Sequence, residues 1–299
     1  MPGVSAPLLM VAASFLFASM GVCVKYASAL YGAGEIVFYR GLIGALFIGG
    51  LVRIRGGSLR TAVPAMHFWR SASGVGALVL WFYAIAGLPL ATAMTLNYMS
   101  SVWMALFLIG GAVMLGSRRV DGRLVAAVLV GFAGVALVLR PTMDDRLLWF
   151  GLAGLLSGRR SARAYLLVTT LGRAGEPDYR IVFYFSLGGM VAGGATMAAG
   201  AANPHSVAGV ALLLAIGVLA TVAQIMMTRA YAIGRTLSNA SLQYLGIVFA
   251  FGYGVLLFDD PVTWMAVAGM ALIVAAGLAA TLLRTQTTPP DTRGPAADA

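Results

Sequence analysis

The chain has few charged residues for its length. Only 10% of its 299 residues are charged and 60% are hydrophobic, with a mean hydropathy of +0.90. A soluble domain carries about 25% charged residues, so most of this chain cannot face water. The composition therefore favours a chain that lies largely inside a lipid bilayer.

Residues that commonly build catalytic or metal sites are also scarce. The single cysteine, Cys23, excludes an intramolecular disulfide and a multi-cysteine metal site. The sequence has no His/Cys/carboxylate cluster for a metal and no Gly-rich loop followed by the Lys-Ser/Thr of a phosphate-binding site. Ser157-Gly158 is similar to a motif of intramembrane serine proteases, but no membrane-embedded histidine is available to activate the serine. We therefore expect no enzyme activity, no cofactor and no bound metal.

The basic residues are unevenly placed. A net charge of +10 could suggest nucleic acid, but the arginines fall mainly in alternate loops, as in a multi-pass membrane protein. With a cytoplasmic N-terminus, the outer loops hold only Arg140 and Arg146, and the inner loops and their edges hold Arg53, Arg55, Arg60, Arg118, Arg119, Arg123, Arg173, Arg229, Arg235, Arg284 and Arg293. This pattern predicts a bacterial inner-membrane protein with both termini in the cytoplasm, no nucleic-acid partner and no obligate protein partner.

Ten apolar stretches are long enough to cross a membrane, which takes about 20 residues at 1.5 Å of rise each. They lie near residues 7–28, 34–52, 65–86, 90–115, 122–140, 147–171, 179–200, 207–232, 236–257 and 262–283. The connections are short and contain Gly, Pro, Asp and Asn, which favour turns. The polar, proline-containing tail from 285 to 299 is expected to be disordered and cytoplasmic.

Two short segments recur at nearly the same spacing. Ile36-Val37-Phe38-Tyr39 returns as Ile181-Val182-Phe183-Tyr184 after 145 residues, and Asn97-Tyr98 is answered by Gln243-Tyr244 after 146. These offsets indicate an internal duplication. Because each copy would hold five spans, an odd number, the second copy must enter the membrane upside down.

The sequence thus predicts an all-α membrane protein with ten transmembrane helices in two inverted five-helix repeats. The repeats would cover residues 1–145 and 146–284. Such an arrangement has a pseudo-two-fold axis in the membrane plane and a substrate site near the midplane.

Several stretches resemble the drug/metabolite transporter superfamily, specifically its EamA-type members. They are the run from Tyr83 to Asn97-Tyr98, the run from Tyr231 to Asn239-Ala240, and the Gly-rich segments beginning at Gly131 and Ala268. The resemblance covers roughly residues 5–285, and it is greatest to YddG-type exporters of aromatic amino acids and methionine. The family's Leu-Gly-Glu pattern at the end of the fourth helix is here Leu115-Gly116-Ser117, so a role of that glutamate is not carried over.

The resemblance implies an exporter of amino acids or similar small amphipathic metabolites that works by alternating access. No carboxylate lies in the middle of a span, which favours a facilitator over a proton-coupled antiporter. A broad-specificity drug/metabolite exporter is the alternative within transport. From other classes, the alternatives are a lipid scramblase and a non-transporting membrane enzyme, and the missing catalytic pair argues against the enzyme.

Substrate-binding residues are expected among polar and aromatic groups near the middle of the spans, where a cargo leaving water needs replacement contacts. Positions that match across the repeat are the best candidates. For each aromatic, packing between helices is the alternative, and for each amide it is an interhelical hydrogen bond. The predicted residues are Trp81, Tyr83, Asn97, Tyr98, Ser101, Trp103, Gln224, Gln243 and Tyr244.

Three charged residues near the outer helix ends are candidates for gating. Lys25, the only lysine, either has such a role or extends to the membrane interface. Glu35 is either a coupling site or a stabilising charge at a helix N-terminus. Arg40, about 9 Å into its helix, either pairs with Glu35 or faces the pathway.

Three arginines, Arg159, Arg160 and Arg163, lie within a single apolar stretch. They span an arc of about 100° on a helix, so one face can hold all of them. Either they form a basic wall that attracts a substrate carboxylate, with Arg163 as a binding residue, or the helix is shortened after Ser157-Gly158 and the arginines meet the cytoplasm.

Overall fold

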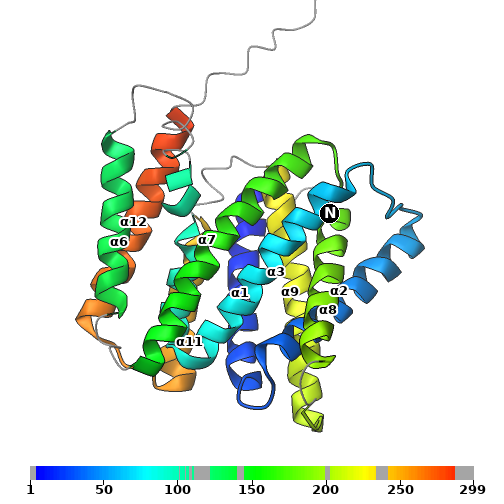
Figure 1. The fold of residues 1–299 in the computed structure, drawn as a ribbon, viewed down its shortest axis with the longest axis horizontal. Coiled ribbons are helices and arrows are strands. Elements are labelled where there is room, and N and C mark those ends of the chain that lie inside the picture. Colours follow the sequence, from blue (N-terminus) through cyan, green and yellow to red (C-terminus); the bar gives the residue numbers. More distant parts are fainter. Residues whose placement is uncertain are drawn as a thin grey trace, which may run out of the picture.

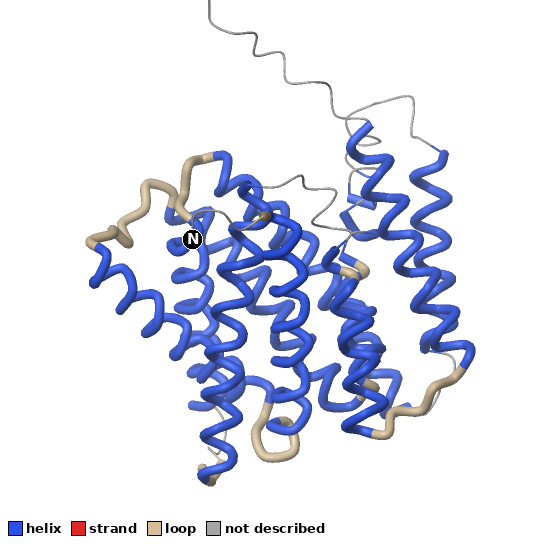
Figure 2. Tube along the Cα trace, turned by 180° about the vertical axis from the view of Figure 1, so that it is seen from behind, coloured by secondary structure: helices blue, strands red, loops and turns tan. Residues whose placement is uncertain are grey.

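The computed structural model describes residues 5–100, 102–104, 106, 107, 110, 122–139, 145–198, 203–233 and 242–286. Its regular elements within these ranges are all helices, which form an elongated bundle (Figure 1, Figure 2). They are α1 (Ala6–Ala27), α2 (Ala33–Arg55), α3 (Pro64–Gly87), α4 (Leu90–Tyr98), α6 (Gly122–Leu139), α7 (Asp145–Arg173), α8 (Asp178–Ala198), α9 (Val207–Ile233), α11 (Leu245–Phe258) and α12 (Trp264–Gln286). Each overlaps one predicted apolar stretch, and several extend a few residues beyond it, so the prediction of ten helices is confirmed.

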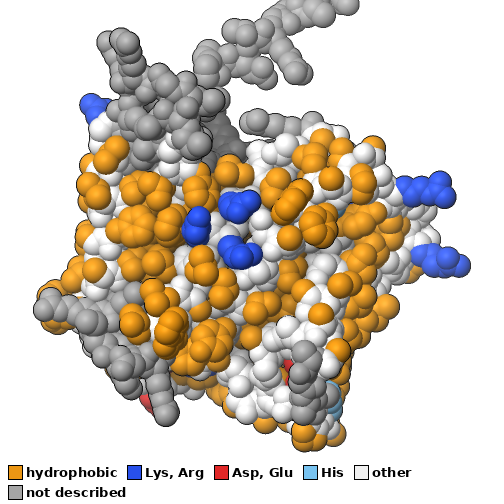
Figure 3. All heavy atoms as spheres, in the orientation of Figure 1, with side chains coloured by type: hydrophobic (Ala, Val, Ile, Leu, Met, Phe, Trp, Pro, Cys, Tyr) orange, Lys and Arg blue, Asp and Glu red, His pale blue; other side chains and the backbone are white. Residues whose placement is uncertain are grey.

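Four helices of the described ranges are apolar and long enough to cross a membrane on length and composition. They are α1, α2, α8 and the Val207–Ala230 part of α9, and shorter apolar segments lie in α6, α11 and α12. The surface is apolar over most of the face in Figure 3. The bundle therefore suits a bilayer.

The helices pack in pairs that respect the predicted repeat. α2 packs on α8, α6 on α12 and α4 on α11, and each pair joins a helix to its counterpart in the other half. The remaining close pairs are α1 with α9 and α3 with α7, which exchange places when the two halves are exchanged. Figure 1 shows the α6–α12 pair at one edge of the bundle and the α2–α8 pair near the other. This is the contact pattern of two copies related by a two-fold axis.

Counterpart helices run in opposite directions. Along α2, Gly34 lies against Thr196, Gly41 against Ser186, and Gly57, just after the helix, against Tyr179, so advancing along α2 means going backwards along α8. In the same way Gly131 of α6 lies near Ala276 of α12, and Gly134 lies near Gly269. The second copy is therefore inverted, as predicted. The division at residues 145/146 stays a prediction.

Glycines allow α2 and α8 to cross closely. A Cβ atom on Gly41 would stand 2.4 Å from the backbone nitrogen of Met190 and 2.5 Å from the carbonyl oxygen of Ser186. A Cβ on Gly193 would stand 2.5 Å from the backbone nitrogen of Phe38. No side chain fits there, since small residues are what let membrane helices approach at backbone distance.

Replacing Gly41 by alanine should destabilise the protein. The methyl group meets backbone rather than a movable side chain, and such overpacking costs about 1–3 kcal/mol. Gly50→Ala on the same helix is the matched control, because a Cβ at Gly50 has nothing within 4 Å. Thermal unfolding in detergent measures both variants. Equal unfolding temperatures for Gly41→Ala and Gly50→Ala would contradict the close crossing.

Candidate substrate site

A central cavity lies between the two halves of the bundle. Its empty volume, including the part open to solvent, is about 600 Å³. Both halves contribute to its wall. The first half supplies Phe17, Met20, Arg40, Arg70, Gly74, Ala77, Leu78, Trp81, Asn97 and Tyr98, and the second supplies Ser161, Ala164, Tyr165, Phe185, Gln224, Met227 and Gln243.

Many of the residues predicted for the site line this cavity. The structure brings together there Trp81, Asn97, Tyr98, Gln224 and Gln243, together with Arg40 from the predicted gating residues. Matching positions across the repeat were the basis for predicting Asn97, Tyr98 and Gln243. They reach one cavity because a two-fold axis places equivalent residues of the two copies around the same point.

The two amides line the cavity and also tie helices together. Asn97 Nδ2 donates to Ser157 Oγ at 2.5 Å and to Ser161 Oγ at 3.2 Å, which links α4 to α7. Gln243 Nε2 donates to Tyr165 Oη at 3.2 Å, which links the segment ahead of α11 to α7. The interhelical hydrogen bond expected as an alternative therefore exists at both positions, and it does not remove either amide from the cavity.

Other predicted residues lie elsewhere. Tyr83 is 43% exposed and stacks on Phe150, with ring centroids 4.6 Å apart. Trp103 packs edge-on against Phe132, and Tyr244 packs edge-on against Tyr98 behind the cavity wall. For these three aromatics, packing between helices is what the structure shows. Ser101 lies outside the described residues.

The arginines of α7 do not reach the cavity. Arg159, Arg160 and Arg163 are exposed, and Figure 3 shows basic side chains gathered in the middle of a mainly apolar face, over the region where α7 and α3 run in Figure 1. The alternative of a helix shortened after Ser157-Gly158 is wrong, because α7 is continuous from Asp145 to Arg173. Gly158 instead allows close packing, since a Cβ there would stand 2.6 Å from the carbonyl oxygen of Leu96.

The cationic groups of the cavity come from α2 and α3. Arg40 and Arg70 are 4% and 3% exposed, and their Cζ atoms lie 5.0 and 3.7 Å from the centroid of the Phe185 ring. Among the residues that the structure describes, Arg40 Nε and both Nε and Nη1 of Arg70 have no hydrogen-bond partner. Arg40 lines the cavity and does not pair with Glu35, as one of the two alternatives for it expected. No carboxylate of the described residues lines this cavity.

Keeping two such charges in an apolar bundle is costly. An arginine at the centre of a span costs about 2.5–3.5 kcal/mol on insertion scales. Each cation–π contact with Phe185 returns about 0.5–2 kcal/mol. The cavity therefore holds positive charge that the surrounding described residues do not balance.

Sequence reasoning missed Arg70. It stands only seven residues into α3, so it resembles the arginines that flank membrane spans. Gly74, one turn later, is the signal that could have identified it. A Cβ on Gly74 would lie 2.9 Å from Arg70 Nη1 and 3.0 Å from the Phe185 ring, so this glycine leaves room for the guanidinium.

Lys25 takes part in a structural junction. Its Nζ lies 2.9 Å from Asp260 Oδ1 and 4.5 Å from the centroid of the Phe258 ring. Asp260 Oδ2 also accepts a hydrogen bond from the backbone N–H of Leu90 at 2.9 Å, at the first turn of α4. The carboxylate thus stabilises the N-terminus of α4. Lys25 anchors the end of α1 to this loop and does not extend freely to the interface.

Glu35, at the start of α2, contacts the segment that leads into α9. Asn203 Nδ2 donates to its Oε2 at 3.0 Å, and His205 Nε2 lies 3.4 Å from its Oε1. The rings of Tyr31 and Tyr39 each lie 5.3 Å from the His205 ring. Glu35 therefore does more than stabilise the α2 N-terminus, because it joins the two halves.

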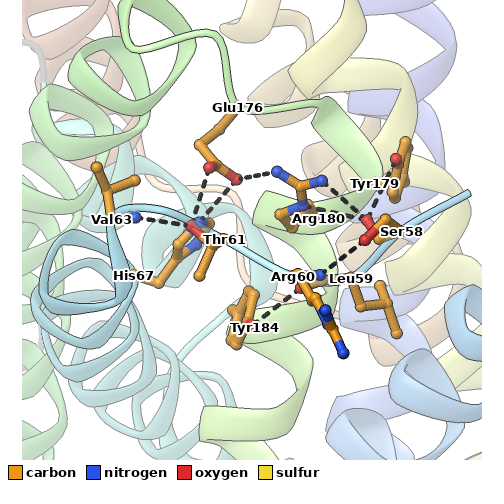
Figure 4. A network of polar contacts seen from close by, with 10 residues as sticks. All are labelled: Ser58, Leu59, Arg60, Thr61, Val63, His67, Glu176, Tyr179, Arg180 and Tyr184. Carbon is orange, nitrogen blue, oxygen red and sulfur yellow. Dashed lines mark hydrogen bonds and ion pairs between the residues drawn. The ribbon is translucent and has the colours of Figure 1, made fainter.

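A similar network stands at the other end of α2 (Figure 4). Glu176 accepts hydrogen bonds from Thr61 Oγ1 at 2.9 Å and from Arg180 Nη1 at 3.1 Å, and its Oε2 is 3.1 Å from His67 Nε2. Burial raises the pKa of Glu176, but these three hydrogen bonds and the Arg180 charge outweigh it, so the pKa lies below its ordinary value. The carboxylate is therefore ionised at neutral pH, and what it contributes to stability is lost only as the pH falls through this lowered value.

Comparison with known proteins places the chain among transporters. Residues 4–140 match the EamA-like transporter family. The chain is 37% identical over 276 residues to the pseudopaline exporter CntI of Pseudomonas aeruginosa, covering 92% of this chain and 95% of that protein. It is 31% identical to a riboflavin transporter of Rhizobium johnstonii, over 61% of this chain and 58% of that protein. A solved crystal structure with 18% identity, covering 93% of this chain and 97% of that one, superposes with a TM-score of 0.66 and shares the fold.

Proposed function

The chain belongs to the EamA-like transporter family, and from this we propose that it exports amino acids or similar small amphipathic metabolites through its central cavity. It is a multi-pass membrane transporter and not an enzyme.

The composition of the cavity wall is the observation that carries the proposal. Trp81, Tyr98 and Phe17 offer aromatic surface, and Gln224 and Gln243 offer amide groups. An amphipathic metabolite needs both, because its apolar part must be covered and its polar groups must exchange water for protein hydrogen bonds. The relatives named as exporters or transporters of pseudopaline and riboflavin support a small metabolite as cargo.

The position of the cavity supports alternating access. It lies between two inverted halves, so a rocking of one half against the other opens it to one side and closes it to the other. No carboxylate of the described wall is available to carry a proton, which supports facilitated export driven by the cargo gradient. We further propose that both termini are cytoplasmic, because the arginines gather in the alternate loops that would then face the cytoplasm.

A broad exporter of lipophilic cations is less well supported. Such cargo favours aromatic and carboxylate groups, whereas Arg40 and Arg70 would repel it. A lipid scramblase would need a polar groove open to lipid, and the polar cavity residues named above are instead buried or half-buried between helices.

Export is tested with the purified protein in liposomes loaded with phenylalanine or methionine. Wild type should release both faster than protein-free liposomes. Gln224→Ala should slow release by roughly five- to tenfold, since one cavity hydrogen bond contributes about 1 kcal/mol. Thr169→Ala, on the exposed surface of α7, is the control and should match wild type.

Two results would contradict the proposal. One is lipid flipping by the wild-type protein without release of any metabolite, which would establish the scramblase. The other is counterflow that accepts cationic dyes and rejects both amino acids.

A further inference from the structure

We propose that Arg40 and Arg70 form one anion-binding site and that the exported cargo is a small organic dianion with an apolar part, such as an aromatic dicarboxylate. This inference rests on the proposed export function and narrows its cargo. It extends the expectation of an amino acid, whose single carboxylate can neutralise only one of the two guanidinium groups.

The two guanidinium groups converge on one point. Both lie against the ring of Phe185, so they are no farther apart than the sum of their 5.0 and 3.7 Å distances to its centroid. α2 and α3 are consecutive helices, and each arginine stands about 10 Å of helical rise from the start of its own helix. The two side chains therefore approach the same ring from opposite ends of the bundle.

The buried polar atoms of this wall that find no partner in the described part of the chain are all donors. They are Arg40 Nε, Arg70 Nε and Nη1, and the indole Nε1 of Trp81, and all are buried. A carboxylate accepts such hydrogen bonds, and an arginine can bind it through two parallel N–H groups. An ammonium group has only donors, so it cannot form a hydrogen bond with any of these atoms. The wall thus selects for negative charge.

Three carboxylates of the described residues already have partners. Glu35 is held by Asn203 and His205, and Glu176 by Thr61, His67 and Arg180. Asp260 is paired with Lys25. Neither these three nor any other carboxylate of the described residues lines the cavity, so the negative charge is left to the cargo.

The test compares three probes that share a phenyl group: phenylsuccinate with two carboxylates, phenylalanine with one, and phenylalaninol with none. Wild-type liposomes should transport phenylsuccinate with the highest affinity and phenylalaninol with the lowest. Arg40→Gln and Arg70→Gln should each lower the affinity for phenylsuccinate by roughly tenfold or more, because each removes a charge-assisted contact. Arg53 is an exposed arginine of α2, and Arg53→Gln should leave the affinity for phenylsuccinate unchanged.

Thermal unfolding separates binding from structure. If the arginines serve the cargo, Arg40→Gln and Arg70→Gln should unfold at a higher temperature than wild type without ligand, because each removes an unbalanced buried charge. Phenylsuccinate should then raise the unfolding temperature of wild type and of Arg53→Gln only. Arginines with a purely structural role would give variants that unfold at lower temperature.

The outcomes are distinct for the two proposals. Wild-type transport of phenylalaninol equal to that of phenylsuccinate would overturn the anion site and leave metabolite export intact. An unchanged affinity for phenylsuccinate in both arginine variants would also overturn the anion site and leave metabolite export intact. If the wild-type protein released none of phenylsuccinate, phenylalanine, phenylalaninol and methionine, the export proposal itself would be overturned.

The glutamates and histidines of the chain lie in two matched pairs. The whole sequence contains two glutamates and two histidines, and they form two pairs, Glu35 with His205 and Glu176 with His67. The repeated tyrosines complete the likeness, since Tyr39 packs on His205 and its counterpart Tyr184 packs on His67. The pairs stand at opposite ends of α2 and α8.

Each pair joins one half of the protein to the other. Glu35 belongs to α2, and His205 precedes α9, in the second half. Glu176 precedes α8, and His67 is in the first turn of α3, in the first half. We infer that these pairs are gate contacts, one at each face, and that each breaks when the cavity opens to its own face while the other stays formed.

The two gate contacts differ in strength. His67 and Glu176 are 2% and 6% exposed, and Arg180 and Thr61 reinforce them. His205 is 31% exposed, and Asn203 is the one additional side-chain donor recorded for its partner, Glu35. Solvent weakens the exposed contact more, so the cavity should open more readily at the Glu35 face.

Thiol labelling tests the gates. In a Cys23→Ser background, Ala164→Cys places a thiol in the cavity wall, and a membrane-impermeant maleimide is added to either side of oriented vesicles. Glu35→Gln should increase labelling from the Glu35 face, and Glu176→Gln from the opposite face, each by roughly fivefold or more. Asp178→Asn, two residues from Glu176 and outside its network, should match the parent. An increase from the same face in both variants, or in neither, would overturn the gates.

Discussion

α2 and α8 cross so closely at Gly41 and Gly193 that the backbone of each occupies the space of a side chain on the other. The crossing fixes the pseudo-two-fold axis, and it brings counterpart residues of the duplicated segment face to face. Arg40 and Phe185, separated by the repeat offset of 145, are one such pair, and the guanidinium lies over the ring. Duplication thus supplied two equivalent positions, and their divergence produced a cation beside an aromatic surface at the centre of the molecule.

The same symmetry links the site to the two faces. The segment that supplies Arg40 also carries Glu35 and Tyr39, and the segment that supplies Phe185 also carries Arg180 and Tyr184. Movement of α2 against α8 therefore acts on the cavity and on both Glu–His pairs together. A cargo that neutralises the arginines favours closer approach of the halves, because it removes the repulsion between two buried charges. In the proposed mechanism, cargo binding and gating are coupled through the α2–α8 pair.

The sequence was sufficient for the architecture and for part of the site. Hydropathy and odd repeat length led to ten helices and inversion, and repeat offsets led to Asn97, Tyr98 and Gln243. Helix periodicity could not decide which way the α7 arginines point, so Arg163 was placed in the site although it is exposed. Arg70 was missed because its distance from a helix end says nothing of the glycine that accommodates it. The Glu–His pairs depend on contacts over more than 100 residues, which a single sequence does not show.

The central claim is that cargo carboxylates meet both buried guanidinium groups. A crystal structure of the protein with phenylsuccinate brominated on its ring tests this directly, since anomalous scattering locates the bromine without bias from the protein. The account predicts bromine beside the aromatic wall near Trp81, with one carboxylate within about 3 Å of nitrogen atoms of Arg40 and the other of Arg70. Bromine bound elsewhere, or a cavity ligand that leaves both guanidinium groups without a carboxylate, would contradict it.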